Sequence, residues 1–352
     1  MKLRLAIILT FTLLVGSLRA TDIPVFIFAG QSIAINSGTD SGRLPAEFLV
    51  PQTNVLFYNG RSTPNSPTTA VHWVTYQAPT GPAYPSDSVY PNPQGTFGPE
   101  ISAANQISKM YYGSAPVAVY KYAVGATSMH YQYNPMVPGP CYAQMLGYLT
   151  NALAALPAET GYQGKIAGVF WTQGESDGID GPEYAAVYGS NLLAFVTSLR
   201  QRFEQPRLPF VYWRITHHWP NADAVRAGQE NLTNLVRDVF MVNADDFETA
   251  TGHYNNDGTI ELGNRYFAGF ESILRSRAGL EIATMGAIGD GAVQLRIYGL
   301  PKTAYSIDYS DRMAPANWLP LNTVGTDLLG LADYTETVTP PRPMRFYRLR
   351  SP

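Results

Sequence analysis

The sequence has little with which to cross-link itself or to bind a polyanion. It contains one cysteine, Cys141, in 352 residues, so an intramolecular disulfide is excluded and the fold must rest on its hydrophobic core. No base lies in the segment around Cys141, and we interpret it as a small buried residue rather than a nucleophile. With 24 basic against 27 acidic residues, the chain lacks the basic excess that nucleic-acid binding requires.

Long apolar runs are also lacking, except for one near the start of the chain. Leu5 to Val15 follows Lys2 and Arg4 and precedes small and polar residues, which is the pattern of a secretory signal peptide. This run is shorter than the roughly 18 to 20 residues that span a bilayer. We therefore expect residues 1–20 to be a cleaved signal, and the mature protein to be secreted or periplasmic with no membrane insertion. Removing them leaves 21 basic against 27 acidic residues, a net charge of about −6.

Two units are expected in the remaining chain, because its length exceeds the usual range of a single domain. In residues 21–278, short apolar runs of strand length occur at 24–29, 117–123, 166–171, 209–215 and 239–242. Stretches of helical periodicity lie between and after them, at 99–110, 143–156, 182–203, 222–237 and 259–275. This alternation predicts an α/β unit with a parallel sheet covered on both faces by helices.

Two parts of the chain depart from this alternation. The polar segment 37–95 is predicted to be a long excursion that faces the substrate rather than a helix. In residues 279–352, alternating segments separated by Gly, Pro and Asp predict a small all-β sandwich. Its segment 305–310, with Trp318 and the terminal 345–349, resembles a C-terminal β module common on exported bacterial proteins. A separate hypothesis is that this accessory module contacts glycan or attaches the protein to the cell surface or a partner.

One residue of each type needed for nucleophilic catalysis follows a predicted strand. Ser32 follows the first strand in Phe-Ala-Gly-Gln-Ser, Glu175 follows the third, and His253 follows the fifth. In a parallel sheet these strand ends open on one edge, where ligands bind. A serine hydroxyl needs a base to take its proton and a third group to orient that base. We therefore predict Ser32 as nucleophile, His253 as base and Glu175 as acid. The structural alternatives are a helix N-cap for Ser32 and a first-turn acid, like Asp177, for Glu175.

Acyl transfer also requires donors directed at the developing oxyanion. The backbone N–H groups of Ser32 and Gly125 and the side-chain amide of Gln173 are the predicted donors, because Gly125 and Gln173 follow the second and third strands. Gln31, beside the nucleophile, and His130, beyond the oxyanion block, are the predicted substrate-binding residues. His130 fits equally well a position on the surface.

Five sequence blocks are similar to those of a known esterase family. They are 30–32 (Gly-Gln-Ser), 97–100 (Phe-Gly-Pro-Glu), 125–128 (Gly-Ala-Thr-Ser), 171–177 (Trp-Thr-Gln-Gly-Glu-Ser-Asp), and His253 with 262–265. In this order they resemble the sialate O-acetylesterase-like branch of the SGNH (GDSL-like) hydrolases, which includes acetylxylan esterases. The resemblance covers nearly all of residues 23–275. It implies a flavodoxin-like three-layer α/β/α fold and hydrolysis of acetyl esters on sugars without metal or other cofactor. It also places Ser32, His253, Gly125 and Gln173 in the roles given above and Glu175 at a family acid.

The chain departs from the family pattern at three positions. Ile33 stands where Asn is common after the nucleophile, Val124 replaces the first Gly of a Gly-Gly pair, and Ala250 stands where many SGNH enzymes carry Asp. The last change leaves Glu175 as the best acid, with Asp246 and Glu248 as weaker candidates, and leaves a Ser-His dyad open.

We therefore predict a serine esterase that removes O-acetyl groups from carbohydrates such as sialic acid or xylan. The alternative is a carbohydrate-binding protein with a degenerate site, which Ile33 and Ala250 favour. A metal site at His217-His218 is not expected, because adjacent residues of an extended chain point to opposite faces and no matching Cys or His cluster accompanies them.

Overall fold

The computed structural model describes residues 20–35, 39–60, 72–77, 97–111, 115–137, 139–247, 252–285, 292–339 and 344–350. Of the predicted signal peptide, residues 1–20, only Ala20 lies within this part of the chain. Most of the second half of the predicted excursion at 37–95 also lies outside the described residues. Among the described helices, none has the length and apolar character needed to cross a membrane.

The first unit is built on a seven-stranded sheet with the order β3-β2-β4-β1-β5-β6-β7. The strands are β1 (Thr21–Gly30), β2 (Gln52–Asn59), β3 (Val74–Tyr76), β4 (Val117–Ala123), β5 (Tyr162–Thr172), β6 (Phe210–Trp213) and β7 (Val239–Val242). All neighbouring pairs are parallel except β2 with β3. The five strands from β4 to β7 have the 2-1-3-4-5 order of doubly wound flavodoxin-like proteins, which confirms the predicted fold class.

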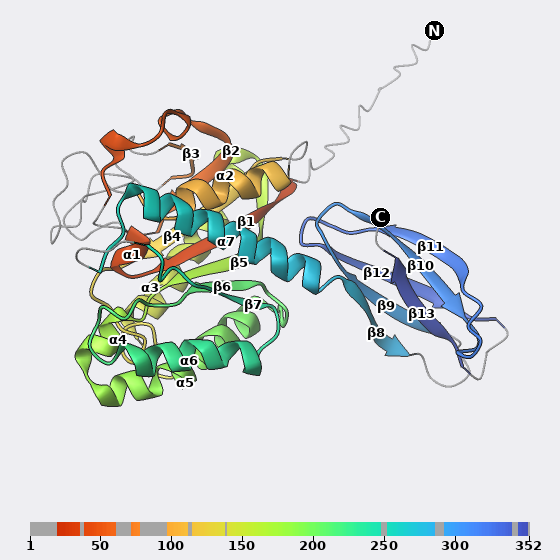
Figure 1. Cartoon of the computed structure of the whole chain (residues 1–352). Coiled ribbons are helices and arrows are strands. Elements are labelled where there is room, and N and C mark those ends of the chain that lie inside the picture. The colour runs from red at the N-terminus through yellow and green to blue at the C-terminus, as the bar shows by residue number, and fades with distance from the viewer. Residues whose placement is uncertain are drawn as a thin grey trace, which may run out of the picture.

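Helices cover both faces of this sheet (Figure 1). They are α1 (Ser32–Ile35), α2 (Glu100–Met110), α3 (Pro140–Thr160), α4 (Glu175–Asp180), α5 (Pro182–Arg202), α6 (Ala222–Leu235) and α7 (Asn256–Ser276), with short 3₁₀ turns at Ser41–Arg43 and Ala46–Phe48. α2 packs on α7 on one face, while α5 packs on α6 on the other. α3 joins the α5 face, where Tyr142 and Phe195 meet edge to face and the Tyr142 hydroxyl hydrogen-bonds Ser198 at 2.5 Å.

The middle of the sheet forms the core. Residues 23–30 of β1 are all buried, because strands pair on both edges of β1 and helices cover both of its faces. Phe28 stacks on Phe170 of β5 with ring centroids 4.4 Å apart. Burying one such side chain contributes about 1.5–3 kcal/mol, so this apolar strand anchors the turn that follows it.

The excursion predicted at 37–95 differs from expectation, because it contributes two strands to the sheet. β2 adds in parallel to the edge of β4, and β3 closes this side of the sheet as an antiparallel edge strand. Although β2 is paired on both edges, only some of its side chains are buried. The sequence of β2, Gln-Thr-Asn-Val-Leu-Phe-Tyr-Asn, therefore lacks the continuous apolar run by which the inner strands were predicted.

The second unit is all β, as predicted, and consists of two three-stranded sheets ordered β11-β10-β13 and β12-β9-β8. Its strands are β8 (Gly279–Met285), β9 (Ala292–Tyr298), β10 (Ala304–Ser310), β11 (Leu319–Gly325), β12 (Leu331–Thr337) and β13 (Phe346–Arg350). Leu295, Ile297, Tyr305 and Ile307 form its buried core. β8, which follows α7 after two residues, was not predicted from the sequence.

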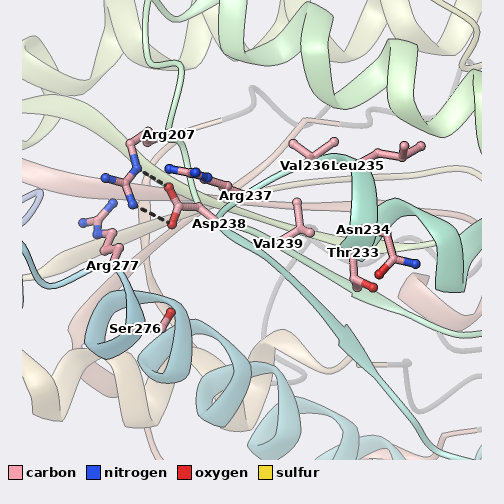
Figure 2. Close-up of a pocket in the computed structure, with 10 residues that line it drawn as sticks. All are labelled: Arg207, Thr233, Asn234, Leu235, Val236, Arg237, Asp238, Val239, Ser276 and Arg277. Carbon is pink, nitrogen blue, oxygen red and sulfur yellow. Dashed lines mark hydrogen bonds and ion pairs between the residues drawn. The ribbon is translucent and has the colours of Figure 1, made fainter.

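The two units meet beside a polar pocket of about 550 Å³ at the amino ends of β6 and β7 (Figure 2). There Arg207 pairs with Asp238 at 2.6 Å and with Glu281 of β8 at 2.7 Å. Nearby, the guanidinium of Arg277 donates to the Leu329 carbonyl, and the Tyr111 hydroxyl donates to the Leu328 carbonyl at 2.9 Å. The arginines in this region therefore link the two units at the end of the sheet opposite the carboxyl ends of the strands.

Candidate active site

The carboxyl ends of β1, β4 and β5 lie side by side, and each leads directly to a predicted site residue. Gly30 is in register with Ala123 of β4 and Thr172 of β5. The Gln31 N–H donates to the Thr172 carbonyl at 2.9 Å, and the Val124 N–H donates to the Gly30 carbonyl at 3.0 Å. This point, where successive connections leave β1 in opposite directions, is where doubly wound folds bind ligands.

Gly30 is required by the close approach of β1 to β5. Its φ is 149°, and a Cβ at this position would lie 2.0 Å from the Thr172 carbonyl oxygen. The Tyr133 hydroxyl also donates to the Gly30 carbonyl at 2.7 Å. The turn that carries Ser32 is therefore fixed from both neighbouring strands.

Ser32 is the first residue of α1 and is 9 % exposed. Within the described part of the chain, neither its hydroxyl nor its backbone N–H has a hydrogen-bond partner. The N-cap alternative for Ser32 requires its hydroxyl to accept from an N–H of the following turn. That contact does not occur among the described residues.

The predicted oxyanion block forms a strained turn after β4. Ala126 adopts a φ of 53°, in the left-handed region that non-glycine residues seldom enter. The Thr127 hydroxyl donates to the Val124 carbonyl at 2.6 Å across this turn. Gly125 lies within it and is partly exposed, so the turn is held in one conformation beside the end of β1.

Gln173 is fully buried and its side chain connects all three turns. Its Nε2 donates to the Thr127 carbonyl at 3.0 Å and to Asp177 Oδ2 at 2.7 Å, and it lies 3.1 Å from the side-chain amide of Gln31. The two hydrogens of the Gln173 amide nitrogen match the two oxygen acceptors of Thr127 and Asp177. The Gln173 amide is therefore engaged by the protein itself.

Asp177, which the sequence analysis treated as a first-turn acid, accepts hydrogen bonds from two different segments. Its side chain is 0 % exposed. It accepts from the backbone N–H groups of Met129 and His130 at 2.8 and 2.9 Å, in addition to Gln173. The signal for this role was its position in the block 171–177, but spacing alone does not reveal which donors a carboxylate meets.

His130 lies at the edge of this network. Its Nδ1 is 3.2 Å from Asp177 Oδ1, and its ring stacks on Tyr184 of α5 with centroids 3.9 Å apart. The hydrogen bond to Asp177 is the main cause that raises the pKa of the imidazole. Tyr184, which sequence reasoning did not identify, is one of several exposed apolar side chains in this region, with Tyr131, Met136 and Ile179.

His253 comes from the segment between β7 and α7. Its ring meets Trp219, from the segment after β6, edge to face with centroids 6.1 Å apart. A Cβ on the preceding Gly252 would lie 2.3 Å from the Trp219 ring. Asn256, at the start of α7, exchanges two hydrogen bonds of 2.8 Å with the backbone of Asp40, beyond α1. The segment that carries His253 is thus tied to the side of the sheet on which Ser32 lies.

Glu175 is 0 % exposed and has no ion-pair partner among the described side chains. One orientation of the Gln31 amide donates to Glu175 Oε2 at 3.1 Å. Burial raises the pKa of this carboxyl to about 8, with the Asp177 charge adding to the effect and backbone N–H groups of Glu175 and Gly174 opposing it. Burial therefore favours the protonated form of this carboxyl group.

The weaker acid candidates have different surroundings. Asp246 makes a two-pronged pair with Arg265, at 2.7 and 2.6 Å, and its side chain is 62 % exposed. Hydrogen bonds from Arg265 lower the pKa of Asp246. Glu248 and Ala250 lie outside the described residues. Among the side chains that are described, no group of three or more His, Cys, Asp or Glu could hold a metal ion.

Comparison with known families identifies the first unit. Residues 22–272 match the family described as carbohydrate esterase, sialic acid-specific acetylesterase. The chain belongs to this family. It is thus a carboxylic-ester hydrolase of the class that removes O-acetyl groups from carbohydrates, as the five sequence blocks predicted. A comparison with curated protein sequences found no match.

Solved structures support the fold. A protein from Arabidopsis thaliana is 19 % identical with a TM-score of 0.56, covering 71 % of this chain and 98 % of its own. XAC1771, a carbohydrate acetylesterase from Xanthomonas citri, is 14 % identical with a TM-score of 0.51, covering 88 % and 71 %. NanS is 15 % identical with a TM-score of 0.51, covering 73 % and 99 %. At these identities the likeness establishes the esterase fold and not a shared substrate.

Proposed function

We propose that this carbohydrate esterase is exported and releases acetate from O-acetylated glycans with Ser32 as nucleophile and His253 as base. The observation that carries the proposal is the position of the Ser32 hydroxyl at the switch point of the sheet, beside the turn that contains Gly125, where it has no hydrogen-bond partner among the described residues. The family points to acetyl esters on sugars, and acetylated sialic acid and acetylated xylan are the first substrates to test.

The reaction follows the chemistry of acyl transfer. His253 takes the proton of Ser32 Oγ as the oxygen attacks the acetyl carbonyl, and the imidazolium returns that proton to the departing sugar oxygen. Water then attacks the acetyl-enzyme with His253 again as base, and the imidazolium returns the proton to Ser32 Oγ as acetate leaves. The N–H groups of Ser32 and Gly125 hold the oxyanion in both steps. For the Gln173 amide to join them, it must turn from the Thr127 carbonyl or from Asp177.

Whether Glu175 can act as the acid that supports His253 depends on its charge state. A charged carboxylate stabilises the imidazolium of the base, whereas a protonated one does not. Because the pKa of Glu175 is raised to about 8, Glu175→Gln should alter the rate mainly above this pH if Glu175 supports His253. If catalysis uses a Ser-His dyad without Glu175, Glu175→Gln should lower the rate by the same factor at pH 6 and pH 9, or at neither pH.

The proposed function is tested by acetate release from 4-nitrophenyl acetate, acetylated xylan and O-acetylated sialic acid. Wild type is compared with Ser32→Ala, His253→Ala and, as a matched control, Ser176→Ala on α4. Loss of turnover in the first two variants alone supports the proposal. Full activity in Ser32→Ala would eliminate Ser32 as the nucleophile.

A degenerate sugar-binding protein remains the second candidate, because Ile33 and Ala250 replace residues common in the family. Calorimetric titration with acetylated xylo-oligosaccharides distinguishes the two. Binding by wild type and Ser32→Ala alike, without turnover of any ester by either, would favour this candidate. The contact of the C-terminal unit with glycan or the cell surface is tested by deleting residues 279–352. Retention of the full-length and the shortened protein is then measured on immobilised glycan and on cells.

A further inference from the structure

We propose that Asp177 is a positioning residue that clamps the turn after β4 to the turn after β5, and so holds the oxyanion donors in place before substrate binds. The inference rests on the proposed function, because it assumes that Ser32 forms the acyl-enzyme. It adds a residue whose role is to act through Gly125 and Gln173 rather than to touch the substrate.

The clamp is visible in how the two carboxylate oxygens divide their donors. Oδ2 accepts from the Met129 N–H at 2.8 Å and from Gln173 Nε2 at 2.7 Å. Oδ1 accepts from the His130 N–H at 2.9 Å and lies 3.2 Å from His130 Nδ1. Oδ2 thus has donors from both turns, while Oδ1 accepts from the His130 N–H and has the imidazole beside it.

The fixed end of the clamp is α4. Gly174, which precedes this helix, adopts a φ of 148°, and a Cβ there would lie 2.7 Å from Ile215. Asn221 Nδ2 donates to the Gly178 carbonyl at 2.8 Å, and the Tyr188 hydroxyl donates to the Gln173 carbonyl at 2.8 Å. The segment that presents Asp177 is therefore anchored on three sides.

The held end is the turn that carries Gly125. Ala126 is in the left-handed region, a conformation that costs of order 1 kcal/mol or more and persists only where surrounding contacts impose it. The contacts that impose it here are the Thr127 carbonyl bond to Gln173 and the two backbone bonds to Asp177, on residues 129 and 130.

Electrostatics favour a carboxylate at this place. Asp177 is buried with the imidazole of His130 as its one ion-pair partner among the described side chains, so its charge is stabilised chiefly by hydrogen bonds. Bonds from N–H groups to an ionised acceptor are about twice as strong as neutral ones. A buried charge in this position orders both turns in advance, which is the requirement for oxyanion stabilisation.

The test compares Asp177→Asn with Asp180→Asn. Asn has the shape of Asp, but its Nδ2 must face at least one backbone N–H donor at either oxygen position, which breaks that half of the clamp. Asp180 lies on the same helix, 3.7 Å from His130 Nε2 and 42 % exposed, and makes none of the clamp's backbone bonds. We expect kcat for 4-nitrophenyl acetate to fall about 100-fold in Asp177→Asn, the size of losing one oxyanion donor. KM should change less than threefold, and Asp180→Asn should match wild type in both.

The outcomes separate this inference from the proposed function. Suppose that turnover by wild type depends on Ser32. If Asp177→Asn then keeps the wild-type kcat, or changes KM by as large a factor as kcat, the positioning role is wrong and the proposed function stands. If Ser32→Ala is as active as wild type, the proposed function is wrong whatever Asp177→Asn does. Labelling of Ser32 by diethyl 4-nitrophenyl phosphate in Asp177→Asn should persist at a lower rate, since nucleophile and base are unchanged.

A measurement on wild type covers the case in which Asp177→Asn does not fold. The amide hydrogens of Met129 and His130 donate to a buried carboxylate, so we expect hydrogen exchange at both to be slowed at least 100-fold relative to an unstructured chain. Exchange at the unprotected rate would show that the clamp does not hold in solution and would overturn the inference.

Discussion

Glu175 and Asp177 are two fully buried acids, two residues apart on α4, whose carboxyl groups have opposite surroundings. Asp177 accepts from Met129, His130 and Gln173. Glu175 has a pKa of about 8 and no cationic partner among the described side chains. Three donors surround the first carboxyl group, while burial favours the protonated form of the second. One short helix thus places two acids of different surroundings beside the same turn.

Glu175 should make the protein less stable as pH rises. Its pKa is higher in the folded chain than the ordinary value of 4.5, so between these values the native state binds more protons than the unfolded state. The free energy of unfolding then falls with pH, by up to about 1.4 kcal/mol per unit. Glu175→Gln should remove this dependence, so its melting temperature should gain on wild type between pH 5 and pH 8. Parallel curves for the two proteins would contradict the assignment.

His130 should contribute in the opposite sense. Its pKa is raised by the hydrogen bond to Asp177, so its stabilising effect is complete below about pH 6.5 and is lost as pH rises through the raised value. His130→Gln should therefore lower the melting temperature more at pH 5.5 than at pH 8.5. The control is His217→Gln, because His217 also pairs with an aspartate, Asp223, but both side chains are exposed. There we expect no change with pH that thermal scanning can resolve.

The pair Lys121–Glu100 should be essential to the fold. Lys121 lies inside β4, and its Nζ is 2.7 Å from Glu100 Oε1 with both side chains at most 5 % exposed. Lys121→Met removes the buried ammonium that lies against the Glu100 carboxylate and should cost about 3–5 kcal/mol, measured by urea unfolding. Adding Glu100→Gln should recover part of this loss. The exposed pair Arg275–Glu271 is the control, and Arg275→Met should cost less than about 1 kcal/mol. Equal losses at the two positions would contradict the prediction.

The inner strands could be predicted from the sequence because each is covered on both faces. Burial of β1, β4 and β5 from both sides demands mostly apolar residues, and runs of such residues mark these strands along the chain, with the paired Lys121 as the exception in β4. β2 and β8 were missed for the converse reason. β2 begins with three polar residues and has exposed positions, and β8 has polar residues within it, so neither has such a run.

The site could be predicted only as far as strand order determines it. Placing Ser32, Gly125 and Gln173 after three adjacent strands follows from the parallel topology. The direction of the Gln173 amide and the donors around Asp177 depend on turn conformations, such as the left-handed Ala126, which no periodicity encodes. The raised pKa of Glu175 likewise follows from burial and not from its place in the motif.

Gly30 and Gly147 should respond to alanine in opposite directions. Gly30 has a φ of 149°, and a Cβ at this position would lie 2.0 Å from the Thr172 carbonyl oxygen. Because there is no room for this atom, Gly30→Ala must push β1 away from β5 and shift the turn that carries Ser32. We expect a loss of at least about 3 kcal/mol in urea unfolding, with esterase activity lost in whatever fraction folds. Gly147 lies within α3 with open space around the Cβ position. Gly147→Ala should therefore stabilise the protein by about 0.5–1 kcal/mol through higher helix propensity and leave activity unchanged. A folded, fully active Gly30→Ala protein would mean that the close approach of β1 to β5 does not position Ser32.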